Sequence, residues 1–439
     1  MNNIFGVTIH EIDLTWPFWI AIVLMLAVRL IGVKGPMKWL GSYGLAVGIV
    51  FCLFLDTWLG TLAQIEHGLF IAQKMYFESW LAAHRIPIFG RALVIPLPGG
   101  QLLMSLLAVN LMVGGIVRVV AKMRASRSTP RRAMLVSLIV AHLGVALLLL
   151  SGAVKLHNSD EGALRMFEGN RSSDYVSYHM WEIAIQNAND QTDVHEFLIP
   201  EEHFLDLTGD VSTRFTVPTL PFELELSHFV PNAIIMPKGP MWDAATPTVE
   251  GWAAKAEERN TTNENNFAAI YARVIPASGG QVRDAILWGR ENFPFVAQAG
   301  GESWAISLRR KRYELPFEVE LVDFVKADHA RMRMAKEYRS DVKVIDDDET
   351  RALRIEMNEP LRKDGYVLFQ SNWGPQDVPN PQRFYSVFTV VRNPSDKWPE
   401  IGMWVLSIAM LIALGIKLYM FLGQQRSRAT RAANARGDA

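Results

Sequence analysis

The sequence is nearly devoid of cysteine and contains none of the short motifs that mark common catalytic centres. Its one cysteine, Cys52, excludes an internal disulfide framework, a CxxC redox pair, a cysteine zinc cluster and a CxxCH haem-attachment site. The HExxH, GxSxG and GxxxxGK[ST] patterns are also missing. These absences leave no support for a hydrolase or a nucleotide-driven enzyme. Any thiol or haem chemistry must act on another molecule.

Charge is sparse over long windows, although the totals look ordinary. The 439 residues carry 44 basic and 45 acidic side chains and a net charge of -1, which gives no indication of a nucleic-acid partner. Most acidic residues lie in one central block, whereas the apolar windows on both sides of it carry few charges. A chain of this length exceeds one ordinary core, so two or three structural units are expected.

Five apolar windows predict membrane-spanning helices, because about 20 residues cross the hydrocarbon core. They lie near residues 16–33, 39–58, 102–120, 134–153 and 401–422. Met1–Thr15 contains no Lys or Arg, so the first window is predicted to be a retained span rather than a cleaved signal. The sequence therefore predicts a four-span membrane region over residues 1–153, and a last span with a basic tail over 399–439.

Residues 61–100, between the second and third windows, mix aromatic, histidine and proline residues with apolar ones. We expect an interfacial segment here, consisting of an amphipathic helix on the membrane surface and then an extended Pro-rich return. Asp56, near the end of the second window, is expected to be a solvated helix end. Cys52 is expected to be a small buried apolar side chain.

Basic residues gather beside two of the spans and predict the orientation of the chain. Those of the internal loop are Arg118, Lys122, Arg124, Arg127, Arg131 and Arg132, with no acidic residue among them. Those of the tail are Arg426, Arg428, Arg431 and Arg436. By the positive-inside rule both are cytoplasmic. We therefore expect a multi-pass protein of the cytoplasmic membrane, in contact with its lipid, with residues 154–398 extracytoplasmic and the C-terminus inside.

The pattern of residues 154–398 predicts mainly β-strands, arranged in a sandwich-like domain of antiparallel sheets. Apolar and polar residues alternate in six runs separated by Pro, Gly, Asn and Asp clusters. The runs begin at Arg214, Phe222, Phe317, Val342, Tyr366 and Tyr385. Two segments are predicted to be helical or irregular: Ser177–Asn189 and the polar Glu250–Asn266.

This domain also contains an internal repeat. Leu220-Pro-Phe-Glu-Leu-Glu-Leu-Ser-His-Phe-Val230 and Leu315-Pro-Phe-Glu-Val-Glu-Leu-Val-Asp-Phe-Val325 align without a gap and share eight of eleven residues. A duplicated β unit explains the repeat, and two similar edge strands of independent origin are the alternative. The histidines His228 and His329 do not align between the copies, which argues against a shared metal site. No metal site is predicted.

His142 lies in the middle of the window 134–153. A neutral imidazole in hydrocarbon needs partners for both nitrogens, and ionisable residues within a membrane are usually functional. Two interpretations stay open: an axial ligand to haem, or a residue hydrogen-bonded to a neighbouring helix. Asn110, one span earlier, is a candidate partner for His142 or a separate interhelical contact. Gly144 would let a planar group or a second helix approach closely.

His67 and His84 lie at the two sides of the predicted amphipathic segment. Either is a candidate contact for a haem edge or for a partner protein, and each is equally explained as an ordinary interfacial residue.

Several stretches occur in a characteristic order along the chain. They are Gly60-Thr61 followed by Gln64, Val109-Asn110-Leu111 ahead of the basic loop, His142-Leu-Gly followed by a leucine run and Gly152, and Gly162-Ala-Leu-Arg-Met-Phe-Glu-Gly169. The stretch that carries the closest resemblance extends from Leu315-Pro-Phe-Glu through Arg339-Ser-Asp-Val-Lys-Val and Asn358-Glu-Pro-Leu-Arg to Gly365-Tyr-Val-Leu-Phe-Gln-Ser371. In this order the chain resembles the ResB family of cytochrome c biogenesis proteins, which work in the system II pathway with a CcsA-type partner.

The resemblance implies half of a two-protein cytochrome c synthase, not catalytic alone, that carries haem across the membrane and presents it to the thiols of apocytochrome c. It implies that His142 ligates this haem together with a histidine of the partner. The Trp-rich haem-handling signature of the CcsA-type partner is absent from this chain, so attachment of haem would need both proteins.

The sequence departs from the family at three places. Asn393-Pro-Ser stands where an Asp-Pro-Gly-like turn is usual, with Asp396 displaced. An additional span precedes the family's first, and residues 231–265 form an insert after the first repeat. A second function therefore stays open: a membrane-anchored scaffold that binds apocytochrome or organises a respiratory or assembly complex, with no haem of its own. Such a scaffold would tolerate replacement of His142, whereas a haem conduit would not.

Overall fold

The computed structural model forms two compact units. It describes residues 3–4, 7–8, 35–88, 91–189, 195–239, 242, 246–328, 335–346, 349–375 and 382–437. The first unit comprises Met1–Ser159 with Asn393–Ala439, and the second comprises Asp160–Arg392. The hydropathy pattern of the sequence predicts these divisions at 153/154 and 398/399. The predicted span 16–33 lies outside the described residues.

Among the described residues of the first unit, four helices are long and apolar enough to cross a membrane: Tyr43–Phe77, Gly100–Ala125, Thr129–Asn158 and Trp398–Arg428. The helical elements are α3 (Pro36–Leu40), α4 (Tyr43–Ala72), the π-helical η1 (Gln73–Phe77), α5 (Gly100–Asn110), the π-helical η2 (Leu111–Val117), α6 (Arg118–Ala125), α7 (Thr129–Asn158) and α8 (Trp398–Gly437). The short strands are β1 (Asn3–Ile4), β2 (Val7–Thr8), β3 (Leu81–Ile88) and β4 (Arg91–Pro98).

The polypeptide folds back on itself within the helix that follows the second predicted span. Helix α4 continues well past residue 58, and at Gly68 the backbone leaves the helical region with φ 77° and ψ 166°. Glycine adopts this positive φ at little cost. Beyond it, η1 returns toward Gly60: a Cβ atom added there would lie 3.2 Å from the Phe77 ring and 3.5 Å from Tyr76 Cβ.

The predicted extended Pro-rich return is a two-stranded hairpin of β3 and β4. Pro87, Pro96 and Pro98 lie in these strands. In the described part of the chain no third strand pairs with the hairpin, so their missing N–H groups are not required. At its base, Gly99 and Gly100 lie against the backbone of Ser79 and Phe77, where any side chain would collide.

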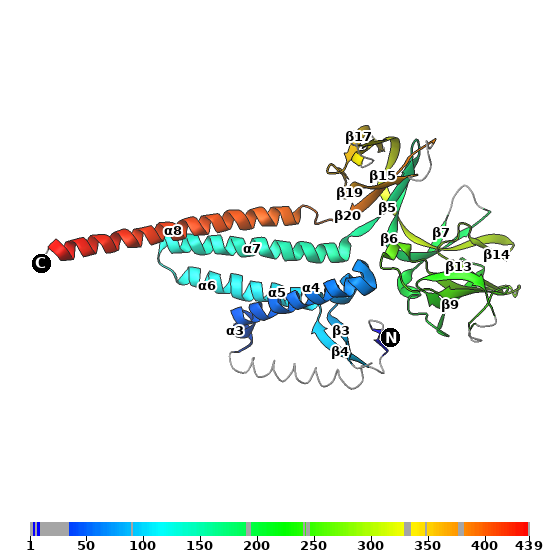
Figure 1. Cartoon of the computed structure of the whole chain (residues 1–439), viewed down its shortest axis with the longest axis horizontal. Helices are drawn as coiled ribbons and strands as arrows, with labels where there is room; N and C mark the ends of the chain where they lie inside the picture. The colour runs from blue at the N-terminus through cyan, green and yellow to red at the C-terminus, as the bar shows by residue number, and fades with distance from the viewer. Residues whose placement is uncertain are drawn as a thin grey trace. The chain divides into compact units, whose positions relative to one another are not determined.

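Helices α7 and α8 lie side by side in opposite directions (Figure 1). Gly144 and Gly402 allow the close approach, because a Cβ atom at either would lie about 3 Å from the other's carbonyl oxygen (3.0 and 3.1 Å). Near the other end of the contact, the Ser151 and Ser395 hydroxyls each donate to the other residue's carbonyl. The α6–α7 turn and the far end of α8 therefore lie at the same end of the unit.

The regular secondary structure described in the second unit is almost entirely β-strand. They are β5 (Asp160–Phe167), β6 (Arg171–Asn187), β7 (Glu196–Pro200), β8 (Ser212–Thr216), β9 (Phe222–Val230), β10 (Ala233–Pro237), β11 (Trp252–Ala256), β12 (Ala269–Pro276), β13 (Arg283–Trp288), β14 (Phe295–Ala299), β15 (Glu302–Asp328), β16 (Ala335–Ile345), β17 (Thr350–Glu356), β18 (Leu361–Lys363), β19 (Tyr366–Gly374) and β20 (Tyr385–Arg392). Two 3₁₀ turns, η3 (Glu201–His203) and η4 (Asn263–Asn265), interrupt them.

The strands form one ten-stranded sheet and two smaller ones. The large sheet runs β17-β16-β15-β6-β5-β20-β19-β18, with β14 also on β15 and β7 also on β6. A four-stranded sheet runs β13-β12-β9-β8, and β10 pairs with β11. All described pairings in the second unit are antiparallel. The unit is thus a large β-rich region, as the alternating runs predict.

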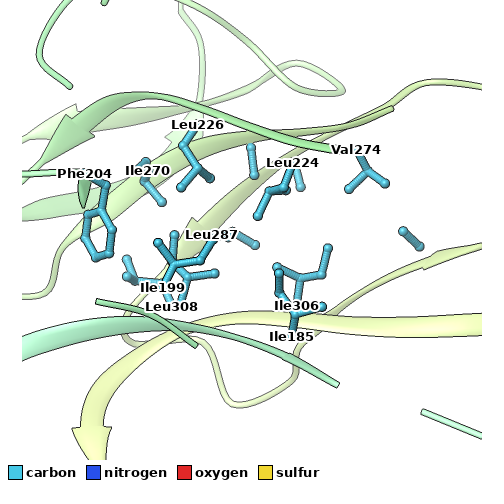
Figure 2. Close-up of a cluster of buried hydrophobic side chains, with 14 of the residues drawn as sticks. Ile185, Ile199, Phe204, Leu224, Leu226, Ile270, Val274, Leu287, Ile306 and Leu308 are labelled. Carbon is cyan, nitrogen blue, oxygen red and sulfur yellow. The ribbon is translucent and has the colours of Figure 1, made fainter. Parts of the chain in front are cut away.

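Two hydrophobic clusters divide this unit. In the first, β9 and β12 face β6 and β15 across a sandwich, and Leu224, Leu226 and Ile270 point toward Ile185 and Ile306 (Figure 2). All its buried members lie between Trp181 and Leu308, whereas those of the second cluster lie over 164–175 and 315–390. The first cluster is therefore inserted into the second along the chain, and the long strands β6 and β15 contribute to both.

The two repeated segments lie one in each cluster and bury the same positions. In the first copy the buried residues are Leu220, Phe222, Leu224, Leu226 and Phe229, and in the second they are Leu315, Phe317, Val319, Leu321 and Phe324. Burial of each such side chain contributes about 1.5–3 kcal/mol. The repeat therefore has a packing role at both places.

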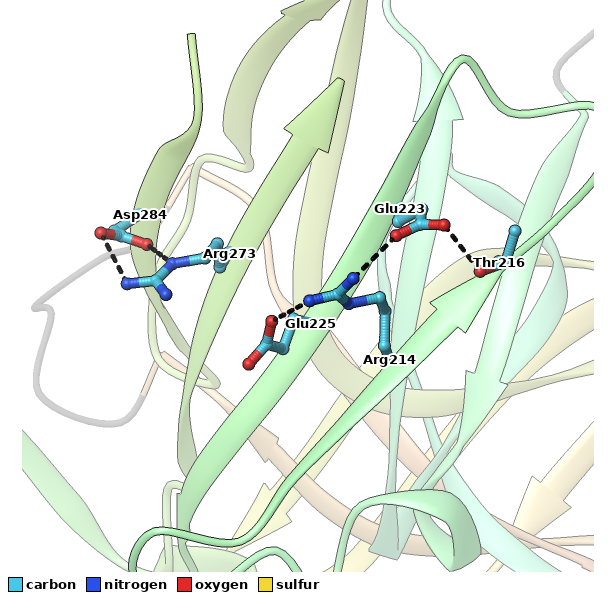
Figure 3. Close-up of polar contacts among 6 residues, drawn as sticks. All are labelled: Arg214, Thr216, Glu223, Glu225, Arg273 and Asp284. Atoms are coloured by element: carbon cyan, nitrogen blue, oxygen red, sulfur yellow. Dashed lines mark hydrogen bonds and ion pairs between the residues drawn. The ribbon is translucent and has the colours of Figure 1, made fainter. Parts of the chain in front are cut away.

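Charged side chains cover part of the four-stranded sheet (Figure 3). Arg214 lies 3.3 Å from Glu223 and 3.1 Å from Glu225, and Arg273 lies 2.7 Å from Asp284. Both arginines are more than half exposed, so each pair contributes only about 0–1 kcal/mol.

The six predicted strand runs are confirmed, since they lie in β8, β9, β15, β16, β19 and β20. The expectation for Ser177–Asn189 is wrong: Ser177 to Asn187 belong to β6. This part of β6 lies between β15 and β7, and residues 181–185 are buried on both faces, so no alternation marks it as a strand. Glu250–Asn266 holds strand β11, the turn η4 and irregular chain.

Candidate functional site

His142 lies on α7 with its two ring nitrogens in different surroundings. Nδ1 is 2.5 Å from the carbonyl oxygen of Leu138, one helical turn earlier. A carbonyl only accepts, so Nδ1 carries the hydrogen and donates it, and the lone pair of the neutral ring is on Nε2. Within the described part of the chain Nε2 makes no hydrogen bond. The half-buried imidazole is thus oriented and keeps one nitrogen available for a ligand bond.

The ring of His142 lies directly against Gly115 in η2. A Cβ atom added at Gly115 would lie 2.2 Å from His142 Cδ2 and 2.8 Å from Nε2, so no other residue fits here unless the ring moves. The preceding Gly114 packs against Gly41, which lies in the turn between α3 and α4. π-Helical turns such as η2 are rare and frequently occur at functional sites. Sequence reasoning missed Gly115, although the Gly-Gly pair inside a span was a visible signal.

Gly144 does not lie on the same side of α7 as His142, and of its two expected roles the structure shows the approach of a second helix. Two residues along a helix turn by about 200°, so the two side chains face opposite directions. Gly144 instead contacts Gly402 and Leu406 of α8. It serves helix packing, the second of the two roles considered for it.

Asn110 is buried but is not placed as the partner of His142. Its amide nitrogen donates to the carbonyls of Leu40, at 2.6 Å, and Ser42, at 3.1 Å. These carbonyls end α3 and precede α4, so Asn110 fastens the α3–α4 turn to α5. The interhelical alternative is confirmed for this residue.

His67 is exposed on α4, immediately before the reversal at Gly68. It shares no hydrogen bond or ring contact with His142 among the described residues. A role of His67 toward haem or a partner stays a prediction.

Comparison with known proteins places these residues in a family. The family model described as the ResB-like family matches residues 136–389, which is more than half of the chain and includes His142. The chain belongs to the ResB-like family. No curated protein matches it.

Membership in the ResB-like family implies a role in cytochrome c biogenesis, in the context of partner proteins. The four apolar helices accord with a membrane protein. The matched residues begin within α7 and end in β20, so they contain His142 and nearly all of the second unit, whereas Asn110 and His67 lie outside them.

At Asn393 this ResB-like chain departs from the Asp-Pro-Gly-like turn predicted from the family pattern, and the structure explains how the turn is kept. Asn393 Oδ1 accepts a hydrogen bond from the backbone N–H of Ser395, at 3.0 Å. It also lies 2.9 Å from the Ser395 hydroxyl, whose one hydrogen it shares with the carbonyl of Ser151. An aspartate oxygen at this position would accept the same two bonds. The amide therefore preserves the turn that leads into α8.

Asp56 contradicts its sequence prediction. It lies in the middle of α4 rather than at a solvated end, and it is 1% exposed. Neither carboxylate oxygen has a hydrogen-bond partner among the described residues. The fold-back at Gly68 covers it, a reversal that hydropathy does not reveal. Like Asn110, it precedes the residues that the family model matches.

Nδ1 of His84, on β3, lies 2.5 Å from the hydroxyl oxygen of the buried Tyr76, and the two share a hydrogen bond. Burial lowers the pKa of His84, and the nearby Glu66 carboxylate opposes this shift. At neutral pH the imidazole is therefore neutral, and Tyr76 is the natural donor.

Proposed function

We propose that the chain is the haem-holding subunit of a system II cytochrome c synthase complex, and that His142 is an axial ligand of the haem that crosses the membrane. The observation that carries this proposal is the state of the imidazole. Its Nδ1–H is bound to Leu138 and its Nε2 keeps a free lone pair. Family membership supplies the context of cytochrome c biogenesis.

The donor set suits haem as a cargo. Haem iron is held in many proteins by one nitrogen of a neutral histidine, while the other nitrogen is bound by a carbonyl that fixes the tautomer and raises ligand basicity. The surrounding helices are apolar, as the macrocycle requires. When bound, haem is the group that becomes joined to the thiols of apocytochrome c. Among the described residues no other histidine contacts His142, so the second axial nitrogen is assigned to a CcsA-type, Trp-rich partner.

The distribution of charge supports an orientation in the cytoplasmic membrane. Basic residues of the α6–α7 turn and of the end of α8 lie at one end of the first unit, because α7 and α8 are antiparallel. By the positive-inside rule this end is cytoplasmic. The chain leaves α7 and re-enters α8 at the opposite end, so the second unit is assigned to the extracytoplasmic side, where apocytochrome c would be met.

The repeat supports a duplicated origin for the second unit. The order β13-β12-β9 around the first copy matches the order β17-β16-β15 around the second, and equivalent positions are buried in both. Independent edge strands would not share neighbours in this way. We assign the first cluster as a copy inserted into the second.

Replacement of His142 separates the haem-holding function from the scaffold alternative. In cells that depend on this gene for cytochrome c, His142→Leu should abolish maturation while the protein accumulates normally in the membrane. His157→Leu, an exposed histidine near the end of the same helix, is the matched control and should leave maturation unchanged. Normal maturation with His142→Leu would favour a scaffold and overturn the assignment.

A further inference from the structure

Asp56 is an ionisable side chain sealed inside the membrane unit. Asp56 is 1% exposed, and neither of its carboxyl oxygens has a hydrogen-bond partner in the part of the chain that the structure describes. An ionised carboxylate without partners in an apolar interior costs many kcal/mol, so such a group binds a proton instead. Ionisable residues that persist inside membrane segments are functional sites by default.

Among the described residues, none supplies a cation that neutralises this carboxylate. Helix α4 has no Lys or Arg over Tyr43–Ala72, and α5 and the described side chains of β4 carry no titratable group. Lys74, on η1, lies over the ring of Phe70. In the part of the chain that the structure describes, no three metal-ligating side chains gather in one place. A proton is therefore the cation that remains.

The groups that face Asp56 come from its own helix and from η1. Cys52 lies one turn earlier on α4, and Tyr76 is brought close by the reversal at Gly68; each interacts electrostatically with the carboxyl. Gly60, one turn later on the same face, contacts Tyr76 and Phe77, which fixes this arrangement.

The hydroxyl of Tyr76 also forms a hydrogen bond with Nδ1 of His84. The carboxylate of Glu66, on α4, interacts electrostatically with His84.

We propose that Asp56 is an intramembrane proton-binding site whose affinity for the proton is set by the Tyr76–His84 pair. In one state the carboxyl is a neutral acid, and the Tyr76 hydroxyl donates to His84. In the other state the acid has released its proton to the surrounding water, and the carboxylate becomes the stronger acceptor for the Tyr76 hydroxyl. This site lies outside the residues matched by the family model and does not depend on the haem proposal.

The experiment is a pH titration of the full-length chain in lipid nanodiscs, followed by the infrared carbonyl stretch of protonated carboxylic acids. The protein is labelled with ¹³C in the aspartate carboxyls. A protonated-aspartate band should persist at pH 7, be lost in Asp56→Asn, shift in Asp56→Glu, and remain in Asp210→Asn, which removes a fully exposed acid. Absence of the band at pH 7, or its survival in Asp56→Asn, would overturn the site.

The link to Tyr76 and His84 is tested by the midpoint of the same titration. His84→Leu frees the Tyr76 hydroxyl for the carboxylate, so the midpoint should fall by about one pH unit, the equivalent of one hydrogen bond. The double variant Tyr76→Phe/His84→Leu has no hydroxyl to offer and should show no such fall. Equal midpoints in the wild type and His84→Leu would overturn the link while leaving the proton site established.

Discussion

At His142, a single hydrogen bond determines which nitrogen is available to a ligand. The sequence showed an imidazole in an apolar helix but could not choose between a ligand and a structural residue. The carbonyl of Leu138 occupies Nδ1, and the helix itself supplies this carbonyl, so no neighbouring helix is required. Of the two ring nitrogens, only Nδ1 has a hydrogen-bond partner among the described residues. Nε2 is therefore free to bind the iron of the proposed haem.

Gly115 should be as sensitive to substitution as His142 itself. In Gly115→Ala the new methyl group would collide with the imidazole, so the ring must move, at a cost of about 1–3 kcal/mol. We expect lower thermal stability and loss of the haem absorbance assigned to His142. Gly152→Ala on α7, where a Cβ atom meets nothing within 4 Å, is the control and should behave as wild type. Equal haem content in both variants would contradict this placement of the ring.

The buried ion pair of the first cluster should contribute far more than the pairs on the sheet surface. Arg309 binds Glu182, which is 3% exposed, and Glu196. In Arg309→Met an unpaired buried carboxylate remains, so unfolding free energy should fall by about 3–5 kcal/mol. Arg214→Met, which removes an exposed arginine with two carboxylate partners, should cost about 1 kcal/mol or less. Denaturant unfolding measures both, and similar losses would refute the distinction.

The same contact predicts a pH dependence of stability. Hydrogen bonding to Arg309 lowers the pKa of Glu196 below its ordinary value. The carboxylate therefore stabilises the fold above the ordinary glutamate pKa of about 4.3, and this contribution is lost as the pH falls through the lower folded value. Arg309→Met should flatten that part of the curve of unfolding free energy against pH.

Among the elements, the turn that precedes α8 shows how a departure from the family pattern can preserve structure. Asn393→Ala removes the acceptor for both Ser395 hydrogen bonds and should cost about 0.5–2 kcal/mol, as loss of a helix-capping side chain does. Asn393→Asp keeps an oxygen in the same place and should unfold at nearly the wild-type temperature. A thermal shift of equal size in the two variants would show that the oxygen is not what matters.

Elements with a clear period were predictable, and those shaped by contacts distant in sequence were not. The run at Phe222 alternates because one face of β9 is buried. Strand β6 has no alternation where both of its faces are buried, so periodicity does not predict this part of it. The fold-back at Gly68 depends on one backbone conformation, and it moved Asp56 from an expected solvated end into the interior.

In the whole molecule, the two clusters of the second unit should respond to mutation separately. Leu226 and Leu321 occupy equivalent repeat positions, and each is fully buried in its own cluster. Either substitution by alanine should cost about 2–5 kcal/mol. Hydrogen exchange should show lost protection mainly within 181–308 for Leu226→Ala and mainly outside it for Leu321→Ala. Uniform loss across both clusters in each variant would indicate one cooperative unit.

The broad division of the molecule was visible in the sequence because long apolar windows and alternating runs are strong signals. The four helices found by length and composition overlap four of the five predicted spans. The neighbours of His142 were not visible, because the π-helical turn that presents Gly115 and the bonds of Asn110 to Leu40 and Ser42 join residues far apart in the chain.

The central claim is that His142 binds haem, and the absorbance spectrum of the complex with the CcsA-type partner tests it most directly. His142→Ala should lose or shift the Soret band, and added imidazole should restore it by supplying the missing nitrogen. His157→Ala should have the wild-type spectrum. A Soret band in His142→Ala that is identical to wild type, without added imidazole, would contradict the account.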